Sequence, residues 1–133
     1  NCSRCGTIDE DMDHVLRCQS TEANEKWVSI VESLRKWMEK CDTHPDLMEM
    51  LCSRLSAWRN GEDLQPMGFS DPVLYQLLLK QDAIGWRACI DGLLVKEWAA
   101  VQASYFEMIE SRRSGKRWAV ALIKKLWDTA WDM

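Results

Sequence analysis

The sequence contains few of the residues that interrupt helices, and it shows no strand pattern. Its 133 residues include three prolines and six glycines. No stretch alternates polar and apolar residues with the period of two that a half-buried strand shows. We therefore expect an all-α protein. No apolar run approaches the roughly 18 residues of a membrane span, and no secretory signal is visible. We expect an intracellular protein, in the nucleus or the cytoplasm, that does not enter a membrane.

The sequence also lacks the usual signatures of catalysis. It contains no glycine-rich phosphate loop, no recognisable pairing of a nucleophile with a base, and no paired carboxylates at a metal-binding spacing. Asp91 with Glu97, and Asp128 with Asp132, share helix faces, and solvated helix charges explain both pairs. We therefore expect a fragment that is not an enzyme and has no small-molecule substrate.

Positive charge is not in excess. The chain has 17 Lys and Arg residues against 21 Asp and Glu residues, which gives a formal net charge of −4. Strong nucleic-acid binders release counterions through clustered Lys and Arg. The composition therefore argues against a dominant nucleic-acid surface, although it leaves room for a local one.

Four candidate zinc ligands lie in the first eighteen residues. Cys2, Cys5, His14 and Cys18 form the pattern C-x2-C-x8-H-x3-C, and Cys3His is one of the usual structural ligand sets of zinc. Gly6 suits the turn of a zinc knuckle because glycine accepts a positive φ. With four protein ligands no position stays open for a catalytic water, so we expect structural Zn²⁺. The alternatives are a disulfide, which would leave His14 unexplained, or reduced thiols.

We expect two parts that form one compact unit. Residues 1–20 are the zinc knuckle, and residues 21–133 are a bundle of about five helices. Cys41, Cys52 and Cys89 fall in helical patterns and are expected as small buried thiols. Eight tryptophans supply enough apolar surface for a core. The chain starts at Asn1, beside a zinc ligand, and ends within an apolar pattern. We therefore expect a piece of a longer polypeptide.

Caps and breaks predict where the helices lie. Ser20 or Thr21 can cap the first helix, Pro45 suits the first turn of the second, and Ser70-Asp71-Pro72 marks the start of the third. His44, beside the proline, is expected in a loop with no chemical role. The expected helices run over about 21–41, 45–60, 72–80, 82–113 and 116–133, and the longest loop over 61–70.

A stripe of small residues runs along the predicted helix 82–113. It consists of Gly85, Ala88, Gly92, Ala99 and Ala103. Because glycine costs about 1 kcal/mol relative to alanine in a helix, two glycines on one face suggest that another segment packs very close. A plain kink at one of the glycines is the alternative.

One cluster of basic residues stands out. Arg112 and Arg113 end a predicted helix, where cations are favoured, but Lys116 and Arg117 start the next one, where cations are disfavoured. A different role is therefore expected for them, namely contact with phosphate. Candidate contributors to the same basic face are Lys124 and Lys125 on the last helix, and Arg4 and Arg17 on the knuckle.

The last helix is apolar over most of its circumference. Such a helix must lie between neighbours, continue into a segment beyond this piece, or dock on a partner. Trp127 and Trp131 are the candidate contacts, either with the remainder of a polyprotein or with a second copy of the chain.

The knuckle residues resemble a known family. Cys2-Ser-Arg-Cys5-Gly and His14-Val-Leu-Arg-Cys18, followed by Trp27, are similar to the zinc-binding region that follows the reverse transcriptase in retroelement polyproteins. Farther on, Ile84-Gly85-Trp86 and Lys96-Glu97-Trp98 resemble downstream segments of transposon-derived open reading frames.

The resemblance implies zinc at the four knuckle ligands and a role in holding template RNA or target DNA. The polymerase's own catalytic aspartates are not in this piece. The expected function is a non-catalytic accessory module that contributes to RNA or DNA binding. The alternative is a protein-interaction or oligomerisation scaffold in which the zinc is purely structural.

Overall fold

The computed structural model describes residues 16–132 of the chain, and the side chains of residues 16–130. Over that range the protein is all-helical, with six helices and no strand, which confirms the predicted all-α class. No helix in this part of the chain is long and apolar enough to cross a membrane. The helices are α2 (Thr21–Lys40), α3 (Pro45–Asn60), α4 (Pro72–Ile84), α5 (Trp86–Ile90), α6 (Glu97–Met108) and α7 (Gly115–Asp132).

Helices α2 and α3 begin where their caps predict. The Oγ of Ser20 accepts a hydrogen bond from the backbone N–H of Ala23 at 3.2 Å, which satisfies one of the unpaired donors at the start of α2. His44, expected as a loop residue without a chemical role, is the N-cap of α3, and its Nδ1 accepts from the backbone N–H of Asp46 at 3.0 Å. Gly61 ends α3 with a φ of 68°, a left-handed conformation that glycine adopts without strain.

The prediction of a single long helix over residues 82–113 is wrong. Gly85 and Gly92 adopt φ values of 94° and 95°, which break the helix twice. Between the breaks lies the short α5, and an irregular segment then leads to α6. Buried Gln81 holds that segment: its Oε1 accepts from the Val95 N–H at 3.1 Å and from the Trp98 Nε1 at 3.0 Å. These breaks are why the bundle has six helices in its described part instead of about five.

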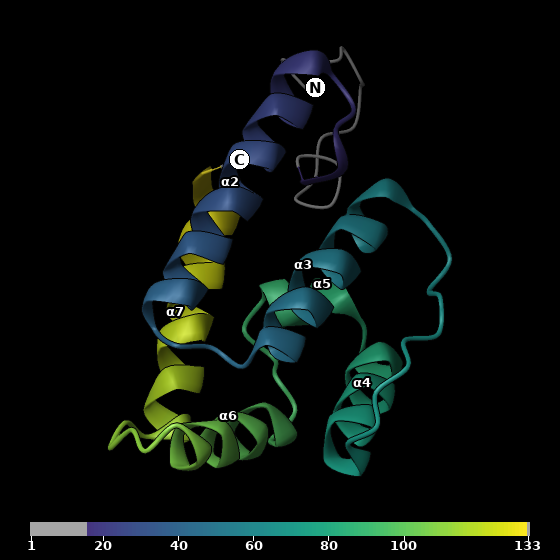
Figure 1. The fold of residues 1–133 in the computed structure, drawn as a ribbon. Helices are drawn as coiled ribbons and strands as arrows, with labels where there is room; N and C mark the ends of the chain where they lie inside the picture. Colours follow the sequence, from purple (N-terminus) through teal and green to yellow (C-terminus); the bar gives the residue numbers. More distant parts are fainter. Residues whose placement is uncertain (1–15, 133) are drawn as a thin grey trace.

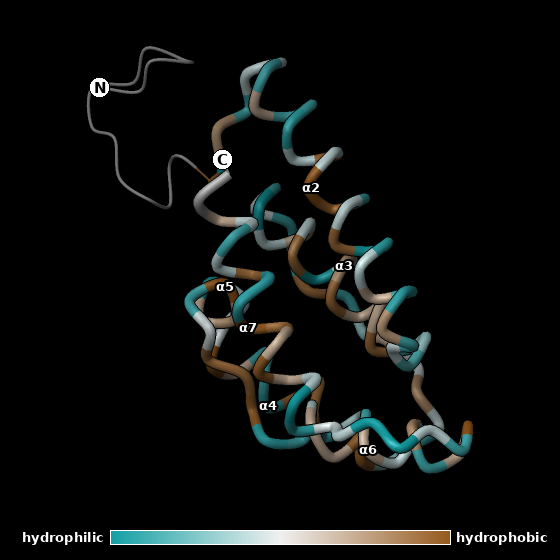
Figure 2. Tube along the Cα trace, turned by 90° about the vertical axis from the view of Figure 1, so that its left-hand side faces the viewer, coloured by the Kyte–Doolittle hydropathy of each residue, from teal (hydrophilic) through white to brown (hydrophobic). Residues whose placement is uncertain are grey.

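The helices pack around one core in which α7 is a central member. Helix α7 packs on α6, α5 and α2, while α3 packs on α2 and α5. Figure 1 shows α6 crossing the end of the bundle that lies opposite the start of α2. Along α2, apolar residues recur about once per turn with polar residues between them (Figure 2), as expected for a helix with one buried face.

Tryptophans form much of this core. Trp86 and Trp98 are almost completely buried and meet edge to face, with ring centroids 6.1 Å apart, an arrangement that aromatic rings favour. The Nε1 of Trp86 donates to Asp82 Oδ1 at 2.7 Å, so its polar edge is satisfied inside the core. Trp27 and Trp118 are buried as well.

Part of the small-residue stripe does mark a close approach. An added Cβ at Gly115, the first residue of α7, would lie 2.6 Å from the Ala103 N and 2.8 Å from the Ala103 Cβ, and the Ala99 carbonyl oxygen is also in contact. Gly92 is likewise crowded, by Trp127. At Gly85 nothing lies near, so that position is only a break. The corner between α6 and α7 therefore depends on a residue without a side chain.

Gly115→Ala tests this corner. We expect the free energy of unfolding to fall by about 1–3 kcal/mol, because the extra methyl group must push α6 and α7 apart. Urea denaturation of both proteins measures the difference. Gly68→Ala is the matched control, since nothing lies within 4 Å of its added Cβ, and its stability should not decrease. Equal stability of the two variants would contradict the close approach.

Candidate functional site

The predicted zinc ligands fall mostly outside the described residues. Cys2, Cys5 and His14 lie there, as does Arg4, and the structure says nothing about them. Cys18 is described: it is buried, and its Sγ lies 3.5 Å from the Ser20 Oγ at the start of α2. The last of the four predicted ligands is thus placed directly at the helix that follows.

Buried Arg59 fixes the segment that carries Cys18. Its Nε donates to the Leu16 carbonyl at 2.9 Å and its Nη2 to the Cys18 carbonyl at 2.6 Å. The guanidinium also lies over the Trp27 ring, 5.3 Å from the centroid. Burial lowers the pKa of Arg59, and Cys18 acts in the opposite direction, but an arginine stays protonated at neutral pH. Residues 16–18, at the end of the predicted knuckle, are therefore tied to both α2 and α3.

Arg17, one of the predicted basic contacts, has a structural partner. Its guanidinium carbon stacks over the Trp58 ring at 4.1 Å from the centroid, a geometry favoured by the ring quadrupole. Arg17 and the cluster around residues 112–117 lie at opposite ends of α2. A helix of 20 residues spans about 30 Å, so the structure does not bring the two basic groups onto one compact site.

At the far end of α2 lies an open groove of about 710 Å³. Four of its lining residues are cationic and none is acidic, although the chain as a whole is negatively charged. Two tryptophans and a phenylalanine supply its apolar surface. The lining residues are Trp37, Lys40, Cys41, Phe106, Arg112, Arg113, Ser114, Arg117, Trp118 and Ala121.

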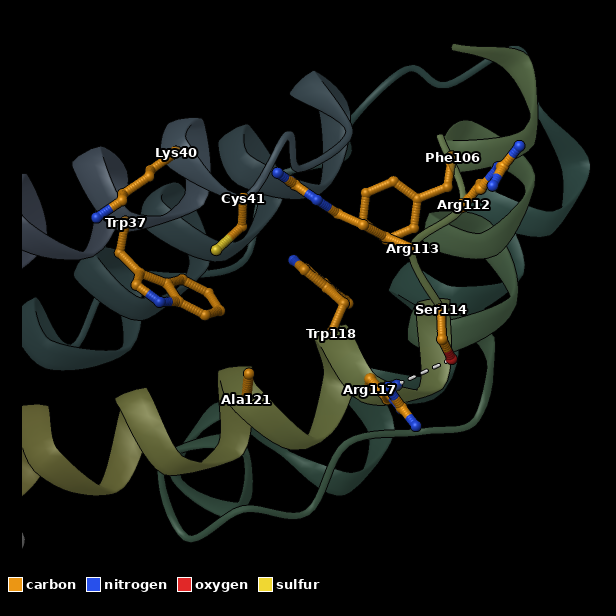
Figure 3. A pocket seen from close by; sticks show the side chains of 10 residues that line it. All are labelled: Trp37, Lys40, Cys41, Phe106, Arg112, Arg113, Ser114, Arg117, Trp118 and Ala121. Atoms are coloured by element: carbon orange, nitrogen blue, oxygen red, sulfur yellow. Dashed lines mark hydrogen bonds between the residues drawn. The ribbon is translucent and has the colours of Figure 1, made fainter. Parts of the chain in front are cut away.

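Figure 3 shows how the side chains lie around this space. Trp37 from α2 and Cys41, the residue directly after this helix, face Trp118 from α7, and Arg113 reaches across from the turn between α6 and α7. The side chains of Lys40 and Arg112 point outward on either side. The groove therefore combines an aromatic interior with a cationic rim.

Long-range hydrogen bonds hold the two walls of the groove together. Gln102 on α6 accepts from the His44 N–H through Oε1 and donates to the Asp42 carbonyl through Nε2, each at 2.9 Å. The Nε1 of Trp118 donates to the Thr43 Oγ1, also at 2.9 Å. These bonds pin the turn between α2 and α3 onto α6 and α7.

One ion pair lies at the edge of the groove. Arg113 Nη1 is 3.1 Å from Asp42 Oδ2, and both side chains are about half exposed. Such exposed pairs contribute little to stability. Arg113 is therefore available to a competing anion at a small energetic cost.

The remaining predicted basic residues do not line the groove. Lys116 and Lys124 are exposed on α7. Lys125 lines a smaller hollow that it shares with Lys26 and Asp128. Of the predicted cluster, three arginines converge on the groove and the lysines do not.

The two tryptophans predicted as interaction residues also differ in what the structure describes. Trp127 is 52% exposed, but its Nε1 donates to the Asp91 carbonyl at 2.9 Å. It therefore connects α7 to the segment after α5. The side chain of Trp131 lies outside the described ones.

Trp37, Lys40, Cys41 and Trp118 were missed as site residues by sequence reasoning. The sequence places the two tryptophans and Cys41 on the apolar faces of their helices, and nothing local distinguishes them from core residues. The sequence signal that could have found the two tryptophans is a neighbouring basic residue at a helix end, which is Lys40 for Trp37 and Arg117 for Trp118.

Metal-binding groups and reactive thiols are the other chemical features to consider in the described part of the chain. Among residues 16–132, no group of three His, Cys, Asp or Glu residues could hold a metal. Burial raises the pKa of the Cys52 and Cys89 thiols. Both thiols are therefore protonated at neutral pH and poor nucleophiles.

Comparisons with family models, with curated proteins and with solved structures gave no match to this chain. Function is therefore inferred from the residues and from their geometry.

Gln102→Met tests whether the walls of the groove depend on the amide. Methionine keeps the length of the side chain but leaves the Asp42 carbonyl and the His44 N–H without their partner, so we expect a loss of about 1–3 kcal/mol in the free energy of unfolding. Chemical denaturation measures it. Gln76→Met, at an exposed position of α4, is the control and should be neutral. An unchanged midpoint for Gln102→Met would show that the amide does not hold the turn.

Proposed function

We propose that this chain is a non-catalytic, zinc-binding accessory module of a retrotransposon-type reverse transcriptase protein, and that it contributes to RNA or DNA binding. The observation that carries the binding role is the convergence of Arg112, Arg113 and Arg117 on one groove that also contains Trp37 and Trp118. Guanidinium groups suit phosphate, and an aromatic ring that is only partly buried, as that of Trp37 is, suits a base.

The net negative charge of the chain does not exclude nucleic-acid binding, because the groove itself is locally basic. Although the chain has a net charge of −4, the groove has four cationic lining residues and no acidic one. Binding that depends on a few phosphate contacts needs a local basic group and not a basic protein.

The zinc role is supported by chemistry and by placement. The Cys3His set and its spacing fit a structural zinc. Arg59 holds the backbone at Cys18 against α2 and α3, which would let a knuckle built on that cysteine pack with the bundle as one unit. In zinc-finger peptides structural zinc contributes about 10–16 kcal/mol of apparent binding free energy, so metal binding should also stabilise the local fold.

Elemental analysis of the purified chain tests the metal. We expect one zinc per chain, and its loss in Cys5→Ser and in His14→Ala, because each change removes one of four ligands. Cys41→Ser is the matched control, since this cysteine lies at the other end of α2, and it should keep the metal. Absence of zinc from the unmodified chain, or equal zinc in all variants, would contradict the proposal.

Two double variants test the basic groove. Arg113→Ala/Arg117→Ala removes two groove cations, while Lys116→Ala/Lys124→Ala removes the same charge from α7 outside the groove. Fluorescence anisotropy with a labelled single-stranded oligonucleotide, over a range of salt concentrations, gives the affinities. Each lost phosphate contact should reduce the salt slope by about 0.7, so we expect a reduction of about 0.7–1.4 for the arginine pair only, according to whether its two cations bind one phosphate or two.

An equal effect of the two double variants would assign the binding to diffuse charge. No binding at low salt by the unmodified chain would contradict the nucleic-acid role altogether.

The second candidate function is a protein-interaction or oligomerisation scaffold. It is favoured by Val120 and Trp127, which are 49% and 52% exposed and lie two turns apart on α7. The indole N–H of Trp127 already donates to the Asp91 carbonyl, so it is not available as a hydrogen-bond donor to a partner protein. We therefore place nucleic-acid binding first.

A further inference from the structure

The tryptophans of the bundle differ in whether the indole has a hydrogen-bond partner or a stacked cation. Trp27, Trp86, Trp98, Trp118 and Trp127 each donate a hydrogen bond through Nε1. Trp58 carries the stacked guanidinium of Arg17. Among the tryptophan side chains that the structure describes, Trp37 alone has neither a hydrogen bond nor a stacked cation within residues 16–130. Its ring is only partly buried, and it faces the groove.

We propose that the groove takes a single-stranded segment of nucleic acid, with one base stacked on Trp37 and the adjoining phosphate bound by Arg113 and Arg117. This inference rests on the proposed nucleic-acid role and specifies the form of nucleic acid that is bound. Stacking on an aromatic ring tolerates every base, because every base has a π face.

The positions of the charged groups fit a phosphate beside the stacked base. Arg113 crosses the groove above Trp118, and Arg117 lies on the first turn of α7 at its rim (Figure 3). The planar guanidinium can bind two phosphate oxygens at once. Asp42 holds Arg113 at 3.1 Å in the free protein, and a phosphate must compete with this carboxylate. Asp42 is thus a built-in competitor of the ligand.

The shape of the site favours a single strand over a duplex. The groove of about 710 Å³ lies within the roughly 300–1,000 Å³ of concave ligand sites, and its aromatic surface lies between two helices. The bases of a duplex are stacked on one another and cannot offer a face to Trp37, whereas those of a single strand can. A site that used only its basic rim would bind both forms.

Four variants and three ligands test the inference. The ligands are a labelled single strand of oligouridylate or oligothymidylate, a duplex of the same length, and the free mononucleotide as a competitor. Trp37→Leu keeps an apolar side chain but removes the stacking surface, and we expect it to weaken single-strand binding about tenfold. Trp37→Phe should retain most of the affinity. Trp127→Leu, the matched control on α7, should bind as the unmodified chain does.

Asp42→Asn provides an independent variant with the opposite sign. Asparagine tolerates the positive φ of 54° at this position, and the backbone carbonyl that Gln102 binds is unchanged. Removal of the competing carboxylate should tighten single-strand binding. Thermal unfolding of each variant separates loss of binding from loss of folding.

The outcomes distinguish this inference from the proposed function. If the arginine variant weakens binding while Trp37→Leu does not, or if the duplex binds as tightly as the single strand, the nucleic-acid role stands and the stacking site is wrong. If the mononucleotide competes as well as the oligonucleotide at equal concentration, the ligand is a nucleotide and the single-strand inference fails. If no nucleic acid binds, both proposals fail.

Discussion

The turn between α2 and α3 is held in place by side chains that come 58 to 75 residues later in the chain. Gln102 binds its backbone on both sides of Thr43, and Trp118 binds the Thr43 hydroxyl. Asp42 in this turn has a left-handed φ of 54°, a conformation that asparagine and aspartate accept more readily than most residues. Because α2 and α7 form two walls of the groove, these bonds help to fix the geometry of the site.

Buried polar side chains hold two other connecting segments in the same way. Gln81 accepts a hydrogen bond from the backbone of the irregular segment before α6, and Arg59 donates to the backbone of the segment before α2. In each case a buried polar side chain replaces the backbone partners that a helix would have supplied, since an unpaired buried polar group costs about 1–3 kcal/mol. The connections between helices are therefore specified by a few long polar side chains as much as by the apolar core.

Much of the helical architecture could be predicted from the sequence. Ser20 and Pro45 set the starts of α2 and α3, and the glycine at 61 sets an end, because capping acts over one turn of chain. The region after Asp82 could not be predicted correctly. Its helical periodicity continues through Gly85 and Gly92, and the bonds from Gln81 that stabilise the broken form connect residues 12 to 17 positions apart, which no local pattern reveals.

The candidate site was only partly foreseeable. The arginines at 112, 113 and 117 stand together in the sequence, so their charge is a local signal. Their aromatic partner Trp37 lies on a different helix and looks like a core residue, because it belongs to the same apolar stripe of α2 as the buried Leu34 and Met38. The zinc site stays a prediction from the sequence, because three of its four predicted ligands lie outside the described residues.

The central claim is that Trp37 is the surface on which the groove receives its ligand. A two-dimensional ¹H–¹⁵N spectrum of the indole N–H groups, with Trp37→Phe used to assign the signal, tests it directly. On addition of single-stranded oligouridylate we predict a shift of the Trp37 signal, while those of the core residues Trp86 and Trp98 stay in place. A stationary Trp37 signal with a shifted Trp127 signal would contradict the claim and direct attention to the outer face of α7.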